Sequence, residues 1–473
     1  MTGRSEAADR AVRGMEEEAM AGSHSYRTDR DPDTPQDAPP LPRTVEETGL
    51  TEGFVTDLVM KTLYRSGTQS GRDLSLRTCL PFAILDEPLL ALQQRRFVEV
   101  LGTEGHGRRS YRFDLTSEGK TRARDVLDQN AYVGPAPVPR DVYREWVERQ
   151  SVRTHPISEE RLRRGLEHLV LSDRFVDRLG AGINSGKSVF LYGDAGNGKT
   201  EVAFSVARIM GSAVYVPHAV ELEGQIIQVY DPYVHPPLSD DEDSGDPLAP
   251  TDAPALWTPA PVHDPRFVRV RRPAVIVGGE LTLDDLELSP GVHEGVFSAP
   301  PQMKANGGVF VLDDFGRQRV RPRDLLNRWM IPLDRATDYL TLPTGHKLEV
   351  PFDSLVFFAT NLNPADLVEE AFLRRIRHKI RMPNPDREQF SEILRRVCGG
   401  RGISYSEEAV ELVFREYYDA LEIEPRACHP RDLVADICDH ARYQGIEPTL
   451  SGTLLRDACR SYFIDLPRTG GAP

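Results

Sequence analysis

The sequence has few of the features that mark exported or membrane-bound proteins. Its five cysteines are odd in number and widely scattered, which argues against a disulfide framework and fits a reducing cytosol. No stretch approaches the roughly 20 consecutive apolar residues that a membrane span needs. The N-terminus also lacks the apolar segment of a secretory signal peptide. We therefore expect a cytoplasmic protein without a membrane span.

Basic residues are scarcer than acidic ones. Lys and Arg number 58 against 73 Asp and Glu, which gives a formal charge of −15 at pH 7. This sign argues against nonspecific coating of nucleic acid or anionic lipid, although it leaves room for a local basic patch. The 39% hydrophobic and 28% charged content is typical of a globular protein. At about 150 residues a domain, 473 residues predict about three domains.

Several segments have too few apolar side chains to build a packed core. We predict a disordered tail over residues 1–42, a proline-rich linker over 134–160, and a short tail over 467–473. Residues 236–265 contain seven acidic residues and no Lys or Arg, so we predict a disordered acidic loop. This loop is either a solvated insertion or a docking segment for a basic partner.

Residues 43–133 have the pattern of a small α+β domain. Apolar periodicity predicts helices over 51–67 and 81–97, and Ser117 is the candidate N-cap of a further helix. Alternating apolar residues flank a glycine-rich turn over 98–115, which is typical of a β-hairpin. Helices followed by a hairpin with a glycine-rich tip resemble a winged-helix domain.

A phosphate-binding motif is the most informative stretch of the sequence. GDAGNGKT matches G-x4-G-K-[ST] in full, between an apolar strand and a periodic helix, which is the context that the motif requires. Its glycines let backbone N–H groups turn toward phosphates at a helix N-terminus. Upstream, Gly186-Lys187-Ser188 imitates only the end of the motif and precedes a strand, so we reject it. The expected nucleotide-binding residues are Gly193, Asp194, Ala195, Gly196, Asn197, Gly198, Lys199 and Thr200.

Polar residues at three places suggest the chemistry of nucleotide hydrolysis. In the motif, Lys199 would reach the β- and γ-phosphates and Thr200 would ligate Mg²⁺. Asp313 and Asp314 follow the buried strand GVFVL, at the strand end where α/β sheets bind ligands. Asp313 would hold Mg²⁺ through water and Asp314 would polarise the attacking water. Asn361 follows another apolar strand, SLVFFAT, where its amide would orient that water.

Taken in order, these residues resemble the motifs of an AAA+ ATPase over roughly residues 160–466. Lys199 and Thr200 match Walker A, and Asn361 matches sensor 1. The two aspartates after GVFVL match Walker B. The resemblance implies ATP and Mg²⁺ as cofactors, and an α/β fold in which a parallel sheet lies between helices.

Two arginines acquire roles only through this resemblance. Arg375, with Arg374 as the second choice, matches the arginine finger that would complete the site of a neighbouring subunit. Arg431 matches sensor 2, which would contact the phosphates of its own subunit. The resemblance implies an α/β core over 161–383 and a C-terminal helical lid over 384–466.

Finer features are similar to one branch of the family. GVFSAPPQMKANGGVFVLDD and residues 324–364 are similar to stretches of bacterial enhancer-binding activators and magnesium-chelatase subunits. YLTLPTGHKLEV predicts a hairpin before Asn361, so the chain resembles the pre-sensor β-hairpin branch, close to MoxR-type ATPases. The GAFTGA loop of the activators is absent. Two features depart from the family: Asp314 stands where Glu is usual, and the insertion over 218–306 is unusually long.

The resemblance implies an ATP-hydrolysing protein that forms a ring, most often a hexamer, and remodels a protein client in a chaperone-like way. Two alternatives stay open. The shorter carboxylate of Asp314 would suit an ATP-dependent switch or scaffold with little turnover. The winged-helix-like domain over 43–133 would suit a DNA-acting or transcription-related ATPase. Its candidate phosphate contacts are Arg95, Arg96, Arg108, Arg109 and Arg112.

Overall fold

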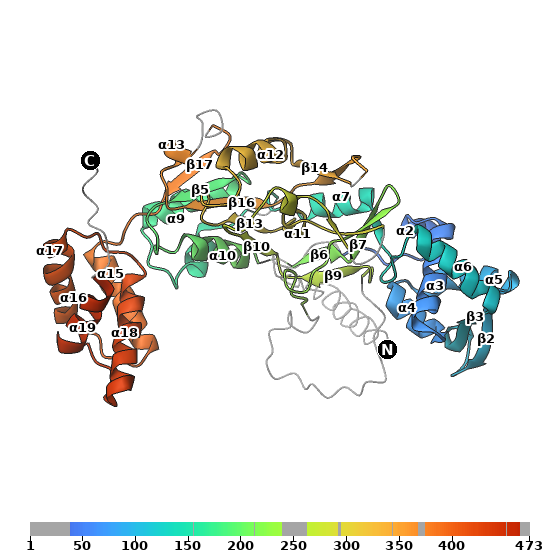
Figure 1. Cartoon of the computed structure of the whole chain (residues 1–473), viewed down its shortest axis with the longest axis horizontal. Helices are drawn as coiled ribbons and strands as arrows, with labels where there is room; N and C mark the ends of the chain where they lie inside the picture. The colour runs from blue at the N-terminus through green and yellow to red at the C-terminus, as the bar shows by residue number, and fades with distance from the viewer. Residues whose placement is uncertain are drawn as a thin grey trace, which may run out of the picture. The chain divides into compact units, whose positions relative to one another are not determined.

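The computed structural model describes most of the chain (Figure 1). The described residues are 38–154, 156–211, 213–238, 263–291, 295–342, 344–367, 374–450 and 452–463. Most of the predicted tail 1–42, most of the predicted acidic loop 236–265 and all of the tail 467–473 lie outside these ranges. None of the described helices is long and apolar enough to cross a membrane.

The described ends of two predicted disordered segments are packed. Pro39, from the predicted tail, is buried and accepts a hydrogen bond of 2.9 Å from the backbone N–H of Asp264. Asp264, which belongs to the predicted acidic loop, is itself buried in an ion pair with Arg266 at 2.7 Å. The interpretation of Asp264 as a solvated loop residue is therefore wrong, because its partner arginine lies just beyond the acidic run.

The predicted helices and hairpin of residues 43–133 are present. The strands form an antiparallel sheet in the order β1-β3-β2, and Leu58, Leu74 and Phe113 lie in a shared core. Thr116, rather than the predicted Ser117, caps the last helix, because its side chain accepts from the N–H of Gly119. The elements are α2 (Val45–Thr48), α3 (Glu52–Ser66), β1 (Gln69–Ser70), α4 (Gly71–Thr78), α5 (Phe82–Gln94), β2 (Val98–Thr103), η1 (Arg108–Ser110), β3 (Tyr111–Leu115) and α6 (Ser117–Gln129).

The predicted linker 134–160 contains packed structure. It includes β4 (Val138–Pro139) and the helix α7 (Arg140–Arg149). Tyr143 and Trp146 of this helix are buried, and the amide of Asn306 donates to the Tyr143 hydroxyl at 2.9 Å. The proline content of the segment suggested a linker, but the apolar residues of α7 follow helical spacing and bury one face.

A five-stranded parallel sheet forms the centre of an α/β core, as predicted. Its alternate side chains point to opposite faces. Val189 and Leu191 pack with α8 (Glu159–Gly165), α9 (Asp173–Asn184) and α10 (Lys199–Met210). Phe190 packs on the other face with α12 (Pro322–Arg335). Burial on both faces explains why the strands are continuous apolar runs. In spatial order the strands are β10 (Ala274–Val277), β13 (Val309–Leu312), β16 (Leu355–Thr360), β5 (Val189–Tyr192) and β17 (His378–Arg381).

A hairpin and two small sheets lie outside the five-stranded parallel sheet. The predicted hairpin before Asn361 is confirmed, since Leu340 pairs with Leu348 in an antiparallel register. The predicted insertion 218–306 is not wholly an insertion, because it contains β10 of the core sheet. It also supplies strands to two small sheets, in the orders β11-β12-β8-β7-β4 and β6-β9. The remaining elements here are β6 (Val214–Pro217), β7 (Ala219–Leu222), β8 (Gln225–Gln228), β9 (Phe267–Val270), η3 (Asp284–Leu286), β11 (Ser289–Pro290), β12 (Val296–Ser298), α11 (Pro301–Lys304), β14 (Thr337–Thr341), β15 (Lys347–Pro351) and α13 (Pro364–Leu367).

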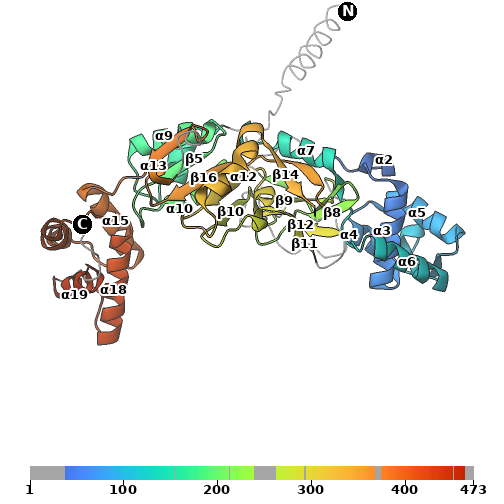
Figure 2. The same cartoon turned by 45° about the horizontal axis from the view of Figure 1, so that its top comes forward.

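The C-terminal helices gather into a bundle, drawn in orange to red in Figure 2. Phe390, Val410, Ile437 and Cys459 contribute to one apolar core. The side chain of Asp386 caps the first helix with a capping box to Gln389. The elements are α15 (Arg387–Gly400), α16 (Glu407–Val413), the π-helical turn η4 (Phe414–Tyr418), α17 (Asp419–Leu421), α18 (His429–Gln444) and α19 (Gly452–Phe463).

Candidate functional site

The loop Gly193–Thr200, here called the P-loop, joins the carboxyl end of β5 to the start of α10. Gly193 lies at φ 144°, and a Cβ there would come within 2.3 Å of the carbonyl oxygen of Met382. Gly196 lies at φ 85°, and a Cβ there would come within 2.4 Å of Cys428 Sγ. Gly198 is the N-cap and offers no side chain to the first N–H groups of α10. The loop therefore ends in backbone donors that suit an anion.

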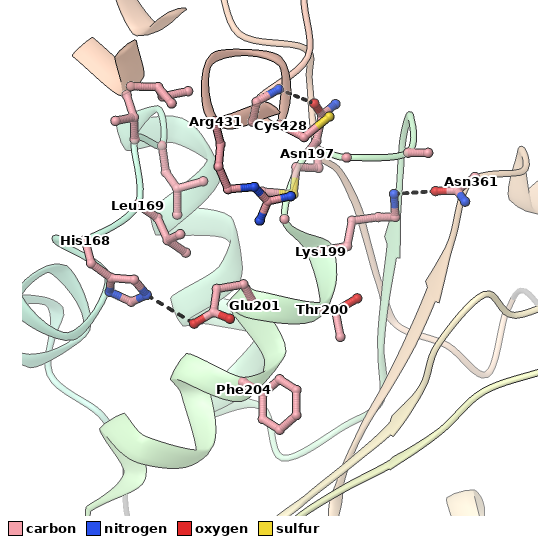
Figure 3. Close-up of a pocket in the computed structure, with 18 of the residues that line it drawn as sticks. His168, Leu169, Asn197, Lys199, Thr200, Glu201, Phe204, Asn361, Cys428 and Arg431 are labelled. Atoms are coloured by element: carbon pink, nitrogen blue, oxygen red, sulfur yellow. Dashed lines mark hydrogen bonds and ion pairs between the residues drawn. The ribbon is translucent and has the colours of Figure 1, made fainter. Parts of the chain in front are cut away.

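Lys199 lies at the centre of the site (Figure 3). Its ammonium donates to the carbonyls of Gly193 at 2.9 Å and Asp194 at 2.8 Å, and to Asn361 Oδ1 at 2.6 Å. Burial lowers the pKa of Lys199, and the neighbouring carboxylates, Asp313 first, oppose that shift. The ammonium thus donates to three oxygen atoms, and these hydrogen bonds hold the Lys199 cation beside the N-terminus of α10.

The polar side chains predicted for the site meet at the carboxyl ends of three adjacent strands. Thr200 Oγ1 donates to Asp313 Oδ2 at 2.9 Å. Asp314 has a left-handed backbone at φ 46°, and its carboxylate accepts from Asn361 Nδ2 at 3.0 Å. Asn361 therefore joins Lys199 to Asp314. A hydroxyl and a carboxylate in contact, Thr200 and Asp313, are the hard oxygen ligands that Mg²⁺ prefers, and it completes its shell with water or phosphate.

These residues line a pocket of about 730 Å³. Its walls come from the P-loop, the segment before α9 and the C-terminal bundle. Arg431 reaches into it from the first turn of α18, with its side chain 69% exposed and paired with Asp432 at 3.3 Å (Figure 3). His168 and Glu201 lie 3.5 Å apart on another wall. The pocket lining includes Asn197, Lys199, Thr200, Asp313, Asp314, Asn361, Cys428 and Arg431.

Arg375 lies apart from the other predicted site residues. It lies three residues before His378, the first residue of β17, which is opposite Val189 at the start of β5. The P-loop follows the carboxyl end of β5, whereas Arg375 precedes the amino end of the neighbouring strand β17. Arg375 Nε is 3.2 Å from Asp334 on α12, and Arg374 beside it is exposed.

Asn384 contacts the P-loop from outside the pocket lining, and Glu424 contacts Asn384. The sequence did not indicate either contact. Asn384 Nδ2 donates to Asp194 Oδ2 of the P-loop at 2.7 Å and also to Glu424. The available signal was the run Pro383-Asn384-Pro385, which holds an amide side chain in an extended backbone between two prolines.

Comparisons with known proteins give little functional information. A family model described as a domain of unknown function (DUF8689) matches residues 386–461, nearly the extent of α15 to α19. No curated protein matches the chain. A crystal structure of NtrX from Brucella abortus is similar at 14% identity and a TM-score of 0.35, over 81% of this chain and 70% of that one. A Thermotoga maritima RuvB, titled a Holliday junction branch migration motor, is similar at 12% identity and a TM-score of 0.32, over 66% and 74%. These identities and TM-scores are too low to indicate a function.

Proposed function

We propose that this chain binds and hydrolyses ATP with Mg²⁺, as an ATPase of the AAA+ type. The observation that carries the proposal is the contact of Thr200 with Asp313, in the same pocket as the Lys199 ammonium, which donates to Asn361. A P-loop lysine, a Mg²⁺-ligating hydroxyl and an acidic strand end are the parts that phosphoryl transfer needs in one place. Here they meet at the N-terminus of α10, where no side chain caps the first backbone N–H groups.

Each residue has a role in this proposal. Thr200 and Asp313 would hold Mg²⁺, which supplies charge neutralisation for the transferred phosphoryl group. Lys199 would exchange its contacts with loop carbonyls for contacts with phosphate oxygens. Asp314 would orient and polarise the attacking water, with Asn361 fixing its carboxylate. Arg431 would contact phosphates from the bundle, which then acts as the lid.

Replacing Lys199 tests the proposal. Lys199→Ala is expected to lower ATP turnover by about 10²-fold or more, since loss of one preorganised electrostatic group has effects of that size. Lys187→Ala is the matched control, because Lys187 is an exposed lysine in the rejected motif copy. Binding of a fluorescent nucleotide with Mg²⁺ and phosphate release are measured for both. Unchanged binding and turnover in Lys199→Ala would overturn the P-loop assignment.

The proposal extends to a ring, most simply a hexamer, of the MoxR-like branch. Support comes from the position of Arg375 before the amino end of β17, whereas the P-loop follows the carboxyl end of the neighbouring strand β5. An arginine finger there would act on the neighbouring subunit. Nucleotide-driven movement of the bundle would then remodel a protein client.

A protein client is favoured over DNA by the ion pairs of the winged-helix-like domain. Arg108 is paired with Asp86 at 2.5 Å, and Arg112 lies 3.7 Å from Glu104. These carboxylates reduce the positive charge on two of the five arginines proposed for phosphate contact. Absence of duplex DNA binding at low salt would agree with a protein client, whereas binding that falls steeply with salt would favour the DNA-acting alternative.

A further inference from the structure

Asn384 uses both the oxygen and the nitrogen of its side-chain amide to join two parts of the chain. Its Oδ1 accepts from Asn197 Nδ2 of the P-loop at 2.6 Å. Its Nδ2 donates to Asp194 Oδ2, also of the P-loop, at 2.7 Å, and to Glu424 Oε2. An amide has two N–H donors, and here both are given to carboxylates. Asp194 and Glu424 are therefore held on one shared donor group.

The backbone presents Asn384 at the joint between the sheet and the C-terminal bundle. Just before it, Met382 donates its N–H to the carbonyl of Tyr192 at 2.8 Å, continuing the pairing of β17 with β5. Two residues after it, Asp386 caps α15. Pro383 and Pro385 on either side restrict the backbone, so the side chain is presented with little freedom.

A second amide of the P-loop reaches the same part of the bundle. Asn197 is 3% exposed, and its Oδ1 accepts from the backbone N–H of Ala427 at 3.0 Å. Glu424 and Ala427 both lie in the segment between α17 and α18, directly before the helix that carries Arg431. The P-loop is thus joined to the segment before α18 by two links. Asn197 makes one directly to Ala427. Asn384, which also contacts Asn197, makes the other from Asp194 to Glu424.

We propose that Asn384 is a positioning residue that couples nucleotide binding in the P-loop to the position of the segment 422–428 and of α18. This inference rests on the proposed nucleotide binding. Phosphates in the pocket bring negative charge near Asp194, whose like charge is repelled. Because Asp194 and Glu424 share the Nδ2 of Asn384, a shift of Asp194 changes the hydrogen bond that holds Glu424.

The isosteric variant separates this role from simple packing. Asn384→Asp keeps the shape but removes both donors, and it places a third carboxylate against Asp194 and Glu424. If Asn384 acts as a donor, Asn384→Asp weakens ADP binding more than Asn384→Ala does. If Asn384 only fills space, the order is reversed, since the isosteric side chain packs as well as the original.

Compensation by Glu424→Gln gives a sharper test. In Asn384→Asp, the added Glu424→Gln supplies an N–H donor to the new carboxylate, so the donor and acceptor of this pair are exchanged rather than lost. Glu424→Gln alone keeps an acceptor for Asn384 and is the matched control. Glu424→Ala removes only the bundle side of the link.

Two measurements on the full chain are needed for each variant. Fluorescent ADP titration with Mg²⁺ reports affinity, and amide hydrogen exchange of peptides covering 422–431, with and without ADP, reports the coupling. We expect ADP to change exchange at 422–431 in the wild type. Asn384→Ala should lose at least half of this change and weaken ADP binding about five-fold. Glu424→Ala should lose the change while affinity stays within two-fold.

The outcomes distinguish this inference from the proposed function. Asn384→Asp should weaken ADP binding more than ten-fold, and added Glu424→Gln should restore at least half of the lost affinity. If Asn384→Asp is milder than Asn384→Ala, or if Glu424→Gln restores nothing, the coupling role is refuted while nucleotide binding stands. If the wild type binds no ADP and Lys199→Ala changes nothing, the proposed function and this inference fail together.

Discussion

The side-chain amide of Asn361 donates to the carboxylate of Asp314 at a distance of 3.0 Å. The oxygen of the same amide accepts from Lys199 at 2.6 Å. One side chain directly after β16 therefore contacts both the P-loop cation and the carboxylate of Asp314, which follows the neighbouring strand β13. Asp314 has φ 46°, a left-handed conformation that Asp tolerates better than most residues. The hydrogen bond and this backbone turn together set where the carboxylate points.

Lengthening the Asp314 side chain is expected to raise ATP turnover. Asp314→Glu adds one methylene, which brings the carboxylate closer to a water beside the P-loop, and we expect kcat to rise about three-fold or more at similar nucleotide affinity. Asp314→Asn removes the carboxylate proposed to polarise the attacking water and should lower kcat by about 10²-fold. Phosphate release measures both. A Glu variant no faster than wild type would mean that the short side chain does not limit turnover.

Two inactive variants are expected to complement each other if Arg375 acts on a neighbouring subunit. Lys199→Ala removes the P-loop function and Arg375→Ala removes the finger, so each protein alone should be nearly inactive. Random mixing leaves one interface in four with an intact P-loop and an intact finger, which predicts about a quarter of wild-type turnover per subunit.

The control for this experiment is a mixture in which Lys199→Ala also carries Arg375→Ala. That mixture supplies no finger and should stay inactive. Complementation in the first mixture alone would establish shared sites, whereas no recovery in either mixture would contradict the ring with a trans-acting arginine. Size-exclusion chromatography with light scattering checks that the variants still assemble.

Gly196 and Gly198 have the same backbone angle, φ 85°. Comparing alanine substitutions at the two positions therefore distinguishes the cost of backbone strain from that of steric contact. A Cβ at Gly196 would come within 2.4 Å of Cys428 Sγ, while at Gly198 the nearest atom is Met382 Cε at 4.0 Å. Each alanine should cost about 1–2 kcal/mol of strain. Only Gly196→Ala should also push the P-loop from the bundle, so added Cys428→Ala should partly restore its stability. Thermal unfolding of the four variants measures this, and equal effects of Cys428→Ala in both backgrounds would contradict it.

The sequence predicted those parts of the fold whose signals are local. The strand before Gly193, the strand before Asp313 and the hairpin before Asn361 are apolar runs with turns between them, and the P-loop is a contiguous motif. The hydrogen bonds of Asn384 to the P-loop join residues far apart in sequence, so no local sequence pattern predicts them. The segment with α7 was misassigned because its prolines outweighed the amphipathic spacing of the buried Tyr143 and Trp146.

Acid is expected to loosen the bundle through His429. Burial, with the charge of Arg426, lowers the pKa of His429 from 6.5 to about 4. Its Nδ1 lies 2.9 Å from the Tyr418 hydroxyl. Since the unfolded chain takes up the proton near pH 6.5 and the folded chain only near pH 4, stability is full above pH 6.5 and falls between pH 6.5 and 4. The loss is on the order of 3 kcal/mol.

Hydrogen exchange in α18 of the full chain measures this prediction. After correction for the intrinsic exchange rate, the free energy of opening should fall from pH 7 to pH 5 in the wild type. His429→Gln keeps a polar side chain that does not titrate, so it should show a flatter dependence. Equal slopes in the two proteins would show that other groups govern the acid response of the bundle.

The buried pair of Asp264 and Arg266 is expected to hold α2 against the insertion. The two side chains are 4% and 3% exposed, and Arg266 also donates to the carbonyl of Thr48 in α2 at 2.7 Å. Arg266→Met leaves the Asp264 carboxylate buried without its partner, which should cost about 3–5 kcal/mol. Adding Asp264→Leu removes that charge, so the double variant should recover most of the loss. Hydrogen exchange at residues 44–50 measures local opening, and a double variant as unstable as Arg266→Met would show that the lost carbonyl contacts, rather than the unpaired charge, dominate.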